Sequence, residues 1–356
     1  MNNTTQRVIK SDHLASDLQE IIDFIRPDKC FILVDEQTAV HCLPLLNDVQ
    51  ATRNAVAIVI PPGDPNKTLN SLGKVWEQLT QHGATRHSLL INLGGGMVTD
   101  LGGFAAATFK RGIRYINIPT TLLGAVDAAV GGKTGINFQG YKNEVGAFYP
   151  PYAVLLSPDF FRSLNRPAIL SGYAEMVKHA LLHSTDEWDT LLAFPLQQID
   201  YPSLNELLFQ SVAIKQAIVE KDPYERGLRK ALNLGHTAGH AFESFALGRG
   251  KPVPHGYAVA WGLVVALWLS YRLHDFPEEK LRKTARFIQQ HYGPFPITCG
   301  DYEALHEIAM HDKKNVGEAM RFTLLKDIGN VLIDQAVEKN TLFDAFDFFG
   351  ELFASP

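Results

Sequence analysis

The chain has 356 residues, more than one hydrophobic core usually organises, so its length alone predicts two domains. Its 46% apolar and 20% charged residues are typical of a globular protein and exclude a disordered or fibrous one. The formal net charge of -5 gives no reason to expect a nucleic acid or an anionic membrane as a partner. A small anionic substrate stays open, because a few clustered Lys and Arg side chains can bind it.

Cysteines and apolar runs bear on the compartment. Cys30, Cys42 and Cys299 lie far apart without CxxC spacing, which favours a reducing compartment and excludes a thiolate zinc site. The N-terminal sequence has no apolar core of signal-peptide length. The longest apolar run, Ala258–Leu269, is shorter than the roughly 20 residues that cross a bilayer. We therefore expect a cytoplasmic protein.

The first part of the chain alternates between β-rich runs and helical segments such as Leu69–Leu79. The β-rich runs are Cys30–Val34, Val56–Ile60, Ser88–Leu93, Tyr115–Ile118 and Ala153–Leu156. This alternation predicts a mostly parallel sheet with helices on its faces.

From about Ser157 the β pattern is absent. Apolar residues such as Leu204, Leu208 and Val212 recur at helical spacing. The run Gly256–Tyr271 is apolar nearly all round, which is typical of a central buried helix. The sequence therefore predicts a nucleotide-binding α/β domain over residues 1–157 and an all-helical domain over residues 158–356.

A glycine-rich turn follows the third predicted strand. Gly94, Gly95 and Gly96 precede a predicted helix, Val98–Phe109. Glycines allow the backbone to approach a phosphate, which the first N–H groups of the helix then bind. The spacing is not GxGxxG, so a purely structural turn is the alternative. Asp35 ends the first predicted strand, where it could accept a ribose hydroxyl or be only a polar strand end.

The segment Pro119–Tyr149 places charged and polar side chains among Gly, Ala and Val, where we expect burial. They are Asp127, Lys133, Lys142 and Asn143. Buried charges are costly unless they are paired or bind a ligand. The two lysines therefore indicate a phosphate or carboxylate site, with solvated loop lysines as the alternative.

Histidines cluster in the sequence LNLGHTAGHAFES. Arg229, Asn233, His236 and His240 are spaced at i, i+4, i+7 and i+11, so a helix would present them on one face. The HxxxH spacing lacks the Glu of the zincin motif. A zinc site with an open position needs three protein ligands. The candidates are His236, His255 and Glu175.

Lysines suggest a polar cavity in the second domain. Lys215 continues the apolar stripe of Leu204 and Leu208, where a core residue is expected. Such a lysine is either snorkelling or functional. Lys178 lies one turn after Glu175 and should face the same side. The run Asp312-Lys313-Lys314, late in the chain, is either a further group of basic side chains for this site or an exposed charged turn.

The ordered set of motifs resembles the dehydroquinate synthases over nearly the whole chain. It comprises GDPNKT (Gly63–Thr68), GGGMVTD, KRG, PTTLL, VDAAVGGKTGIN, YKN, AEMVKH, LNLGHTAGHAFES, PHG and DKK. The resemblance implies a Rossmann-like N-terminal domain and a helical C-terminal domain. Two departures are Thr99, in place of a frequent glycine, and Tyr257, in place of a common glutamate.

The resemblance also implies residue roles. Glu175, His236 and His255 would hold catalytic zinc, or cobalt in its place. NAD would be bound by Asp35, Asp64, Lys67, Gly94, Gly95, Gly96, Asp100, Thr120 and Thr121, with Lys133 and Lys142 nearby. The substrate phosphate would contact Lys133, Asn143, Arg111, His240 and either Lys313 or Lys314, with Arg111 supplied by the second subunit of a homodimer. The substrate carboxylate and hydroxyls would contact Arg229, Lys215, Asn233, Asp127, Lys178 and Lys142.

The implied reaction is a phosphate-eliminating cyclisation. 3-Deoxy-D-arabino-heptulosonate 7-phosphate would undergo NAD-dependent oxidation, phosphate loss, re-reduction and aldol closure to 3-dehydroquinate, a step of aromatic amino acid biosynthesis through the shikimate pathway. One rival is a metal-dependent NAD polyol-phosphate dehydrogenase. Such an enzyme needs fewer basic residues at its substrate, so the many basic residues of this sequence argue against it. A second is another sugar phosphate cyclase, and a third is a non-catalytic NAD-binding scaffold, which would have lost metal or base residues.

Overall fold

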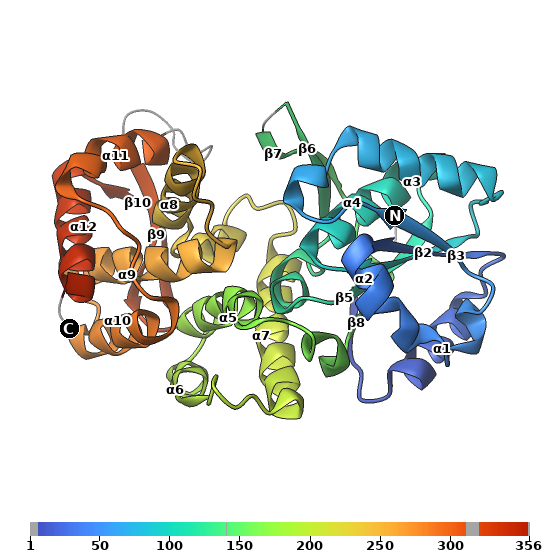
Figure 1. The fold of residues 1–356 in the computed structure, drawn as a ribbon. Coiled ribbons are helices and arrows are strands. Elements are labelled where there is room, and N and C mark those ends of the chain that lie inside the picture. Colours follow the sequence, from blue (N-terminus) through green and yellow to red (C-terminus); the bar gives the residue numbers. More distant parts are fainter. Residues whose placement is uncertain (1–5, 140, 311–319, 355–356) are drawn as a thin grey trace. The chain divides into compact units, whose positions relative to one another are not determined.

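The computed structural model of the chain describes residues 6–139, 141–310 and 320–354. The chain forms two compact units (Figure 1). The first comprises Met1–Asn165 and Gln198–Gln216, and the second comprises Arg166–Gln197 and Ala217–Pro356. The helix α7, Tyr201–Lys221, contributes residues to both units. The predicted boundary at residue 157 stays a prediction.

The first unit is built on a six-stranded sheet in the order β1-β8-β5-β4-β2-β3, with every neighbouring pair parallel. Its strands are β1 (Arg7–Lys10), β2 (Cys30–Asp35), β3 (Val56–Ile60), β4 (Leu89–Gly94), β5 (Arg114–Pro119) and β8 (Ala153–Leu156). All five predicted strands are present, and the parallel α/β prediction is confirmed. The short strand β1 was not predicted.

Helices accompany this sheet in the first unit. They are α1 (Leu14–Ile25), α2 (Glu36–His41), α3 (Leu69–Gln81), α4 (Gly96–Thr108) and most of α7. The central strand β4 is buried at every residue, as expected for a parallel sheet covered on both faces. Phe31, Leu90 and Leu101 belong to the hydrophobic core that packs α3 and α4 on the sheet. Short 3-10 turns lie at Leu43–Leu46, Gln50–Thr52, Asp64–Asn66, Phe109–Arg111 and Pro158–Phe161.

Two irregular segments follow β5. Gly124–Ala128 forms a π-helical turn, which we call the π-turn. The strands β6 (Lys133–Phe138) and β7 (Tyr141–Phe148) then pair as an antiparallel hairpin outside the main sheet. Residues of β7 are largely exposed, as is Lys133 of β6, so the burial expected for this segment is wrong there, whereas the central residues of β6, Thr134–Ile136, are buried. A two-stranded ribbon can cover only one of its faces, which leaves its polar side chains accessible.

The second unit is organised around α9, whose long buried surface contacts α5, α8, α10, α12 and β9 (Figure 1). Its helices are α5 (Arg166–Leu181), α6 (Thr185–Ala193), the end of α7, α8 (His236–Gly248), α9 (His255–His274), α10 (Glu278–Tyr292), α11 (Tyr302–Met310) and α12 (Lys339–Ala354), with 3-10 turns at Leu228–Asn233 and Cys299–Asp301. The central helix predicted at Gly256–Tyr271 is confirmed. Among the described residues α9 alone is long and apolar enough to span a membrane, but 72% of its most apolar window is buried, as in a core helix.

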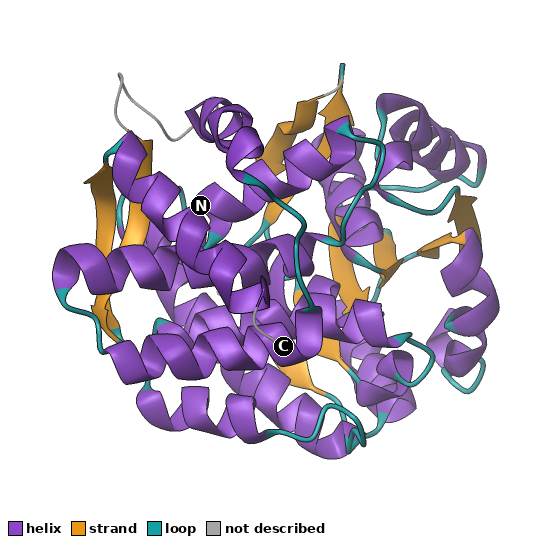
Figure 2. Cartoon of the chain, turned by 60° about the vertical axis from the view of Figure 1, so that its left-hand side comes forward, coloured by secondary structure: helices purple, strands orange, loops and turns teal. Residues whose placement is uncertain are grey.

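The prediction of an all-helical second domain is wrong in one respect. The strands β9 (Met320–Asp327) and β10 (Asn330–Val337) form an antiparallel hairpin within the second unit, visible among the helices in Figure 2. The side chains of β9 are mostly buried, so its run of apolar residues lacks the alternation of a half-exposed strand. Gly329, with a φ of 78°, provides the tight turn between the two strands.

Candidate cofactor and metal sites

The glycine-rich turn of the first unit leads directly from β4 into α4. The helix begins at Gly96, two residues before the predicted start, and its N-cap residue is Gly95, which has no side chain to cap it. The first N–H groups of α4 can therefore bind an external anion. Thr120 donates its backbone N–H to Gly94 O at 3.0 Å, which ties the end of β5 to this turn.

A buried lysine joins three sequence motifs beside the sheet. The Nζ of Lys67 forms an ion pair with Asp100 of α4 and a hydrogen bond with Asn143 Oδ1 at 2.5 Å. Burial raises the pKa of Asp100 to about 6, although Lys67 lowers it. Lys142 lies 3.7 Å from Asp64 Oδ2, across the same loop and hairpin. The structure thus brings together five of the predicted NAD or phosphate residues.

The π-turn presents Asp127 to α7. Lys215 donates to the carbonyl oxygen of Asp127 at 2.5 Å and forms an ion pair with its carboxylate. Lys215 is buried, as predicted for an inward-facing lysine, whereas the Asp127 side chain is 40% exposed. Thr121 Oγ1 accepts the N–H of Gly124 at 3.0 Å and so begins the turn.

Other predicted residues of the first unit differ in their surroundings. Asp35 caps α2, where its Oδ1 accepts the N–H groups of Gln37 and Thr38, so its position has a structural reason independent of NAD. Lys133 is exposed on β6. Arg111 is exposed and has a φ of 65°, and Lys110 before it a φ of 49°. Left-handed backbone at two successive non-glycine residues is strained and marks this turn as a functional candidate.

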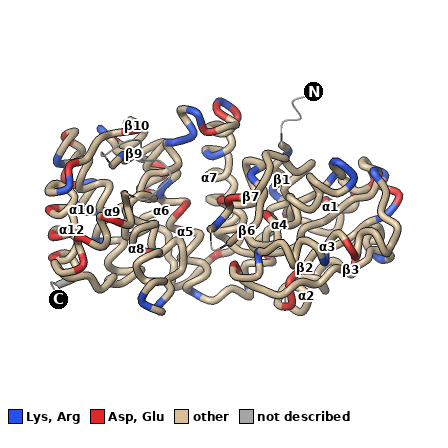
Figure 3. The backbone as a smooth tube through the Cα atoms, turned by 90° about the horizontal axis from the view of Figure 1, so that it is seen from above, with Lys and Arg blue, Asp and Glu red and all other residues tan. Residues whose placement is uncertain are grey.

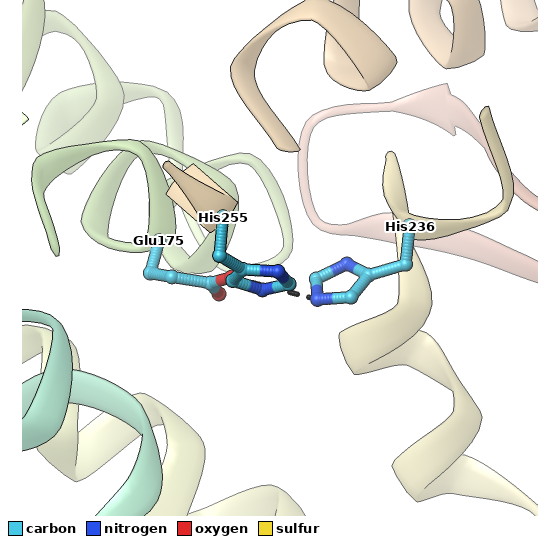
Figure 4. Close-up of side chains that lie close together, drawn as sticks. All are labelled: Glu175, His236 and His255. Atoms are coloured by element: carbon cyan, nitrogen blue, oxygen red, sulfur yellow. Dashed lines mark ion pairs between the residues drawn. The ribbon is translucent and has the colours of Figure 1, made fainter. Parts of the chain in front are cut away.

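In the second unit, Glu175, His236 and His255 converge from three helices (Figure 4). The Nε2 atoms of His236 and His255 lie 3.5 and 3.6 Å from Glu175 Oε1. Ligand atoms of a tetrahedral zinc ion are roughly 3.3 Å apart, given bonds of about 2.0–2.1 Å. Among the residues that the structure describes, these three are the one group of His, Cys, Asp or Glu spaced to hold a metal.

Close backbone contacts explain why the three ligands meet. A Cβ at Gly256, next to His255, would lie 1.9 Å from Ser171 O, one turn before Glu175. A Cβ at Gly262 would lie 2.0 Å from the carbonyl oxygen of Gly235, which precedes His236. Only glycine lets α9 approach α5 and the start of α8 this closely. The glycines of α9 thereby position ligands on its two neighbours.

The carboxylate oxygens of Glu175 are available to coordinate a metal ion. Its side chain is fully buried, and within the described part of the chain neither carboxylate oxygen has a hydrogen-bond donor of suitable geometry. Lys178, also buried, forms an ion pair with Oε2, so the lysine predicted to face Glu175 does so. A buried carboxylate with one cation and no hydrogen bonds retains lone pairs for a further ligand.

Protonation of the three groups is consistent with this interpretation. Burial raises the pKa of Glu175, but Lys178 and the two histidines outweigh it and hold the pKa well below its usual range. Burial and the charge of Lys178 hold the pKa of His236 well below normal, which leaves a neutral imidazole for coordination. Burial lowers the pKa of His255, yet the carboxylates of Glu175 and Glu243 raise it to about 10. A metal ion would displace that proton.

The remaining predicted residues of the second unit do not share one helix face. Leu228–Asn233 is a 3-10 turn, and Gly235, with a φ of 77°, separates it from α8, so of the four residues spaced from Arg229 to His240 only His236 and His240 lie in an α-helix. His236 and His240 do lie on one side of α8, with ring centroids 5.3 Å apart. Arg229 is buried and donates to Pro223 O at 2.7 Å. Lys313 and Lys314 lie outside the described residues.

Sequence analysis missed two acidic neighbours. Glu243 Oε2 lies 3.0 Å from His255 Nδ1, the position from which carboxylates commonly orient a metal-binding histidine. Glu243 lies seven residues, or two helical turns, after His236, and this spacing could have placed it on the same face of the helix. Glu225 accepts from Asn233 Nδ2 at 3.3 Å and has a φ of 57°. Nothing in the sequence indicated this contact, because it depends on the turns before α8.

The parallel sheet with its uncapped helix start, and a helical unit with a buried Glu-His-His group, define a class of two-unit α/β-plus-helical proteins with a candidate anion site and a candidate metal site. Family models for the 3-dehydroquinate synthase N-terminal and C-terminal regions match residues 57–171 and 172–315. A 3-dehydroquinate synthase of Parabacteroides distasonis is 51% identical over 98% of this chain and 99% of its own length. One from Streptococcus pyogenes serotype M18 is 35% identical over 90% of each chain. The chain belongs to the 3-dehydroquinate synthase family.

Solved structures support the fold independently. The 2-epi-5-epi-valiolone synthase from Streptomyces hygroscopicus, with NAD+ and Zn2+ bound, has a TM-score of 0.86 and 22% identity, and the match covers 99% of this chain and 98% of the other. A 2-deoxy-scyllo-inosose synthase complexed with carbaglucose-6-phosphate, NAD+ and Co2+ has a TM-score of 0.83 and 22% identity over 95% of each chain. At these identities the similarity establishes the fold alone.

Proposed function

We propose that the chain is a phosphate lyase that converts 3-deoxy-D-arabino-heptulosonate 7-phosphate into 3-dehydroquinate and phosphate. The observation that carries the proposal is the buried Glu175–His236–His255 group, whose carboxylate lacks hydrogen-bond donors, in a chain 51% identical to a 3-dehydroquinate synthase. A substrate with a carboxylate, several hydroxyls and a phosphate requires many cationic contacts. Lys215, Arg229 and Lys178 are buried cations of the kind that such contacts need.

Two groups would support the chemistry. NAD would be held by Asp64, Lys67, Asp100, Thr120, Thr121 and the Gly94–Gly96 turn, with Asp35, Lys133 and Lys142 as further contacts, and Zn2+ or Co2+ by Glu175, His236 and His255. When bound, NAD accepts and returns a hydride, and the divalent ion acidifies the hydroxyl that is oxidised.

The protein's own residues supply binding, orientation and proton control. The uncapped start of α4 and Lys67 would neutralise the pyrophosphate of the cofactor. Arg111, Lys133, Asn143, His240 and Lys313 or Lys314 would hold the substrate phosphate, while Arg229, Lys215, Asn233, Asp127, Lys178 and Lys142 would fix its carboxylate and hydroxyls. Fixed positive charge around the phosphate stabilises it as a leaving group and restricts its motion.

The setting of the enzyme is part of the proposal. We infer a cytoplasmic homodimer in which Arg111 reaches the partner's substrate, and we expect neither nucleic acid nor membrane as a partner. Lys and Arg are interspersed with Asp and Glu in both units (Figure 3), in keeping with a small-molecule substrate.

One assay separates the proposal from its rivals. Purified protein with the heptulosonate phosphate, catalytic NAD and zinc should release phosphate while no NADH accumulates. Stoichiometric NADH would instead identify a polyol-phosphate dehydrogenase. Phosphate release only from a sugar phosphate without a carboxylate would identify another sugar phosphate cyclase.

A further inference from the structure

Two asparagines lie inside the parallel sheet of the first unit, where apolar side chains are the rule. Asn92 of β4 and Asn117 of β5 are directly paired in register and are 0% and 3% exposed. A buried amide is costly unless it is hydrogen-bonded. Asn92 Nδ2 donates to Asn117 Oδ1 at 2.9 Å, and Asn117 Nδ2 donates to the carbonyl oxygen of Ala129 at 3.2 Å. The pair thus directs one donor out of the sheet to the residue just after the π-turn.

Gln6 holds the same carbonyl from a different part of the chain. Its Nε2 donates to Ala129 O at 3.1 Å, and its Oε1 accepts the N–H of Gly131 at 2.9 Å. Its main-chain oxygen accepts from Gln216 Nε2 at 3.1 Å. Gln6 therefore connects the end of the π-turn to α7.

Ala129 is also the residue that closes the π-turn. Its N–H donates to Gly124 O at 2.8 Å, the i to i+5 bond that defines this geometry. Both backbone polar groups of Ala129 are thus fixed, one within the turn and the other by Asn117 and Gln6. π-Turns are rare and tend to relax to α-helix unless their surroundings maintain them. A π-turn contains one residue more than an α-helical turn. If it relaxed to α-helix, the side chains that follow would rotate by about 100°.

The turn has little room to adjust in other ways. A Cβ at Gly124 would lie 3.0 Å from the N atom of Gly96, so the turn packs backbone to backbone on the glycine-rich turn. On its other side, Lys215 holds both the carbonyl and the carboxylate of Asp127. Lys215 and Gln216 are adjacent on α7, so one turn of that helix contacts both Asp127 and Gln6.

We propose that Asn117 and Gln6 are positioning residues that maintain the π-turn through Ala129 and so hold the Asp127–Lys215 pair in its working orientation beside the glycine-rich turn. The inference rests on the proposed function, in which Asp127 and Lys215 contact the carboxylate and hydroxyls of the substrate. Neither Asn117 nor Gln6 is among the residues proposed to contact the substrate. Both side chains act through the backbone of Ala129, which explains the polar side chain of Asn117 in the sheet interior; Asn92 supports Asn117 with one donor, and its Oδ1 has no hydrogen-bond partner among the described residues.

A double-mutant cycle tests this inference in the full-length protein. Asn117→Ala should lower kcat for phosphate release about tenfold or more, whereas NAD affinity, measured by fluorescence titration, should change less than about threefold. In an Asp127→Asn background the same change should lower kcat less than about threefold, because the residue through which it acts is already altered. An equal loss in both backgrounds would overturn the inference.

Gln6→Met is the second variant, because Asn117→Ala leaves Asn92 without its acceptor and could impair folding. It should repeat the loss of kcat and the non-additivity with Asp127→Asn. Ser88→Ala is the matched control, since Ser88 is fully buried just before β4 and donates to Asp28 Oδ1 at 2.7 Å away from the π-turn. Its kcat should stay within about twofold of wild type.

Hydrogen exchange gives a readout that does not depend on the reaction. The Ala129 amide should exchange at least about tenfold faster in Asn117→Ala and Gln6→Met than in wild type, and at the wild-type rate in Ser88→Ala. Unchanged exchange at Ala129 would refute the positioning role. If the wild type releases no phosphate but exchange follows this pattern, the proposed reaction is wrong while the positioning of the π-turn stands.

Discussion

Buried charged side chains differ between the two units in the partners that surround them. In the first, Lys67 and Lys215 each meet a carboxylate and an additional oxygen acceptor from the protein itself. In the second, Glu175 has Lys178 as an ion-pair partner, but among the residues that the structure describes neither of its oxygens has a hydrogen-bond donor of suitable geometry. The first arrangement is complete without a ligand, whereas the second has coordination capacity that its own residues leave unused.

This difference shows what each unit requires from a bound group. A satisfied ion pair can persist as structure and needs a ligand only for function, whereas an unsatisfied buried acceptor is destabilising until an ion binds it. We therefore expect metal to contribute both stability and chemistry in the second unit, and NAD to contribute mainly chemistry in the first.

The largest effect should come from removing a metal ligand. His236→Ala should abolish stoichiometric zinc, measured by elemental analysis, and lower phosphate release roughly a thousandfold or more, because three protein ligands are needed to hold the ion. His183→Ala is the control, since His183 is exposed and pairs with Glu187. Full zinc retention in His236→Ala would contradict the ligand assignment.

A change next to the metal group should test how α9 positions it. Gly256→Ala would place a Cβ 1.9 Å from Ser171 O and should lower the free energy of unfolding by about 2 kcal/mol or more, measured by urea denaturation. Gly248→Ala, at the end of α8, would place its Cβ in open space with no atom within 4 Å and should be neutral or slightly stabilising. Equal stability of the two variants would show that α5 and α9 can separate without cost.

Metal removal should distinguish the two units directly. Chelation should lower the unfolding temperature and speed amide exchange in α8 and α9, because zinc at about 100 times its Kd stabilises the folded state by about 2.7 kcal/mol. NAD should protect the start of α4 and the π-turn instead, with a smaller gain in stability. If zinc slowed amide exchange only in the first unit, the metal would belong to that unit and the comparison of the two units would be wrong.

The smallest effect concerns the pH dependence of Asp100. Its pKa rises from 3.8 to about 6 through burial, so its protonated form is favoured on folding. That contribution is fully present below pH 3.8 and is lost as the pH rises to about 6. Asp100→Asn should therefore gain stability relative to wild type across this window, as measured by denaturation at several pH values. Parallel stability curves for the two proteins would exclude a raised pKa.

Much of the fold could be predicted from local sequence. Strands such as Val56–Ile60 and the buried helix around Gly256–Tyr271 have apolar patterns that depend only on neighbours in the chain. The hairpin β9–β10 was missed, because burial of β9 removes the alternation that identifies a half-exposed strand. The break before α8 was missed as well, since helical spacing from Arg229 to His240 gives no sign of the left-handed Gly235.

The sequence by itself determined the parallel α/β unit, the buried helix α9, the glycine-rich turn and the identity of the three metal-ligand candidates, since these depend on residue type and spacing. Only the tertiary structure decided that Glu175 lacks hydrogen-bond donors, that Glu243 supports His255, and that Asn117 and Gln6 hold the π-turn. Those features join residues that are distant in the chain, and no periodicity records which buried donor meets which acceptor. The glycine-rich turn and the Glu-His-His group were visible as residues, but their different needs for a ligand emerged only from packing.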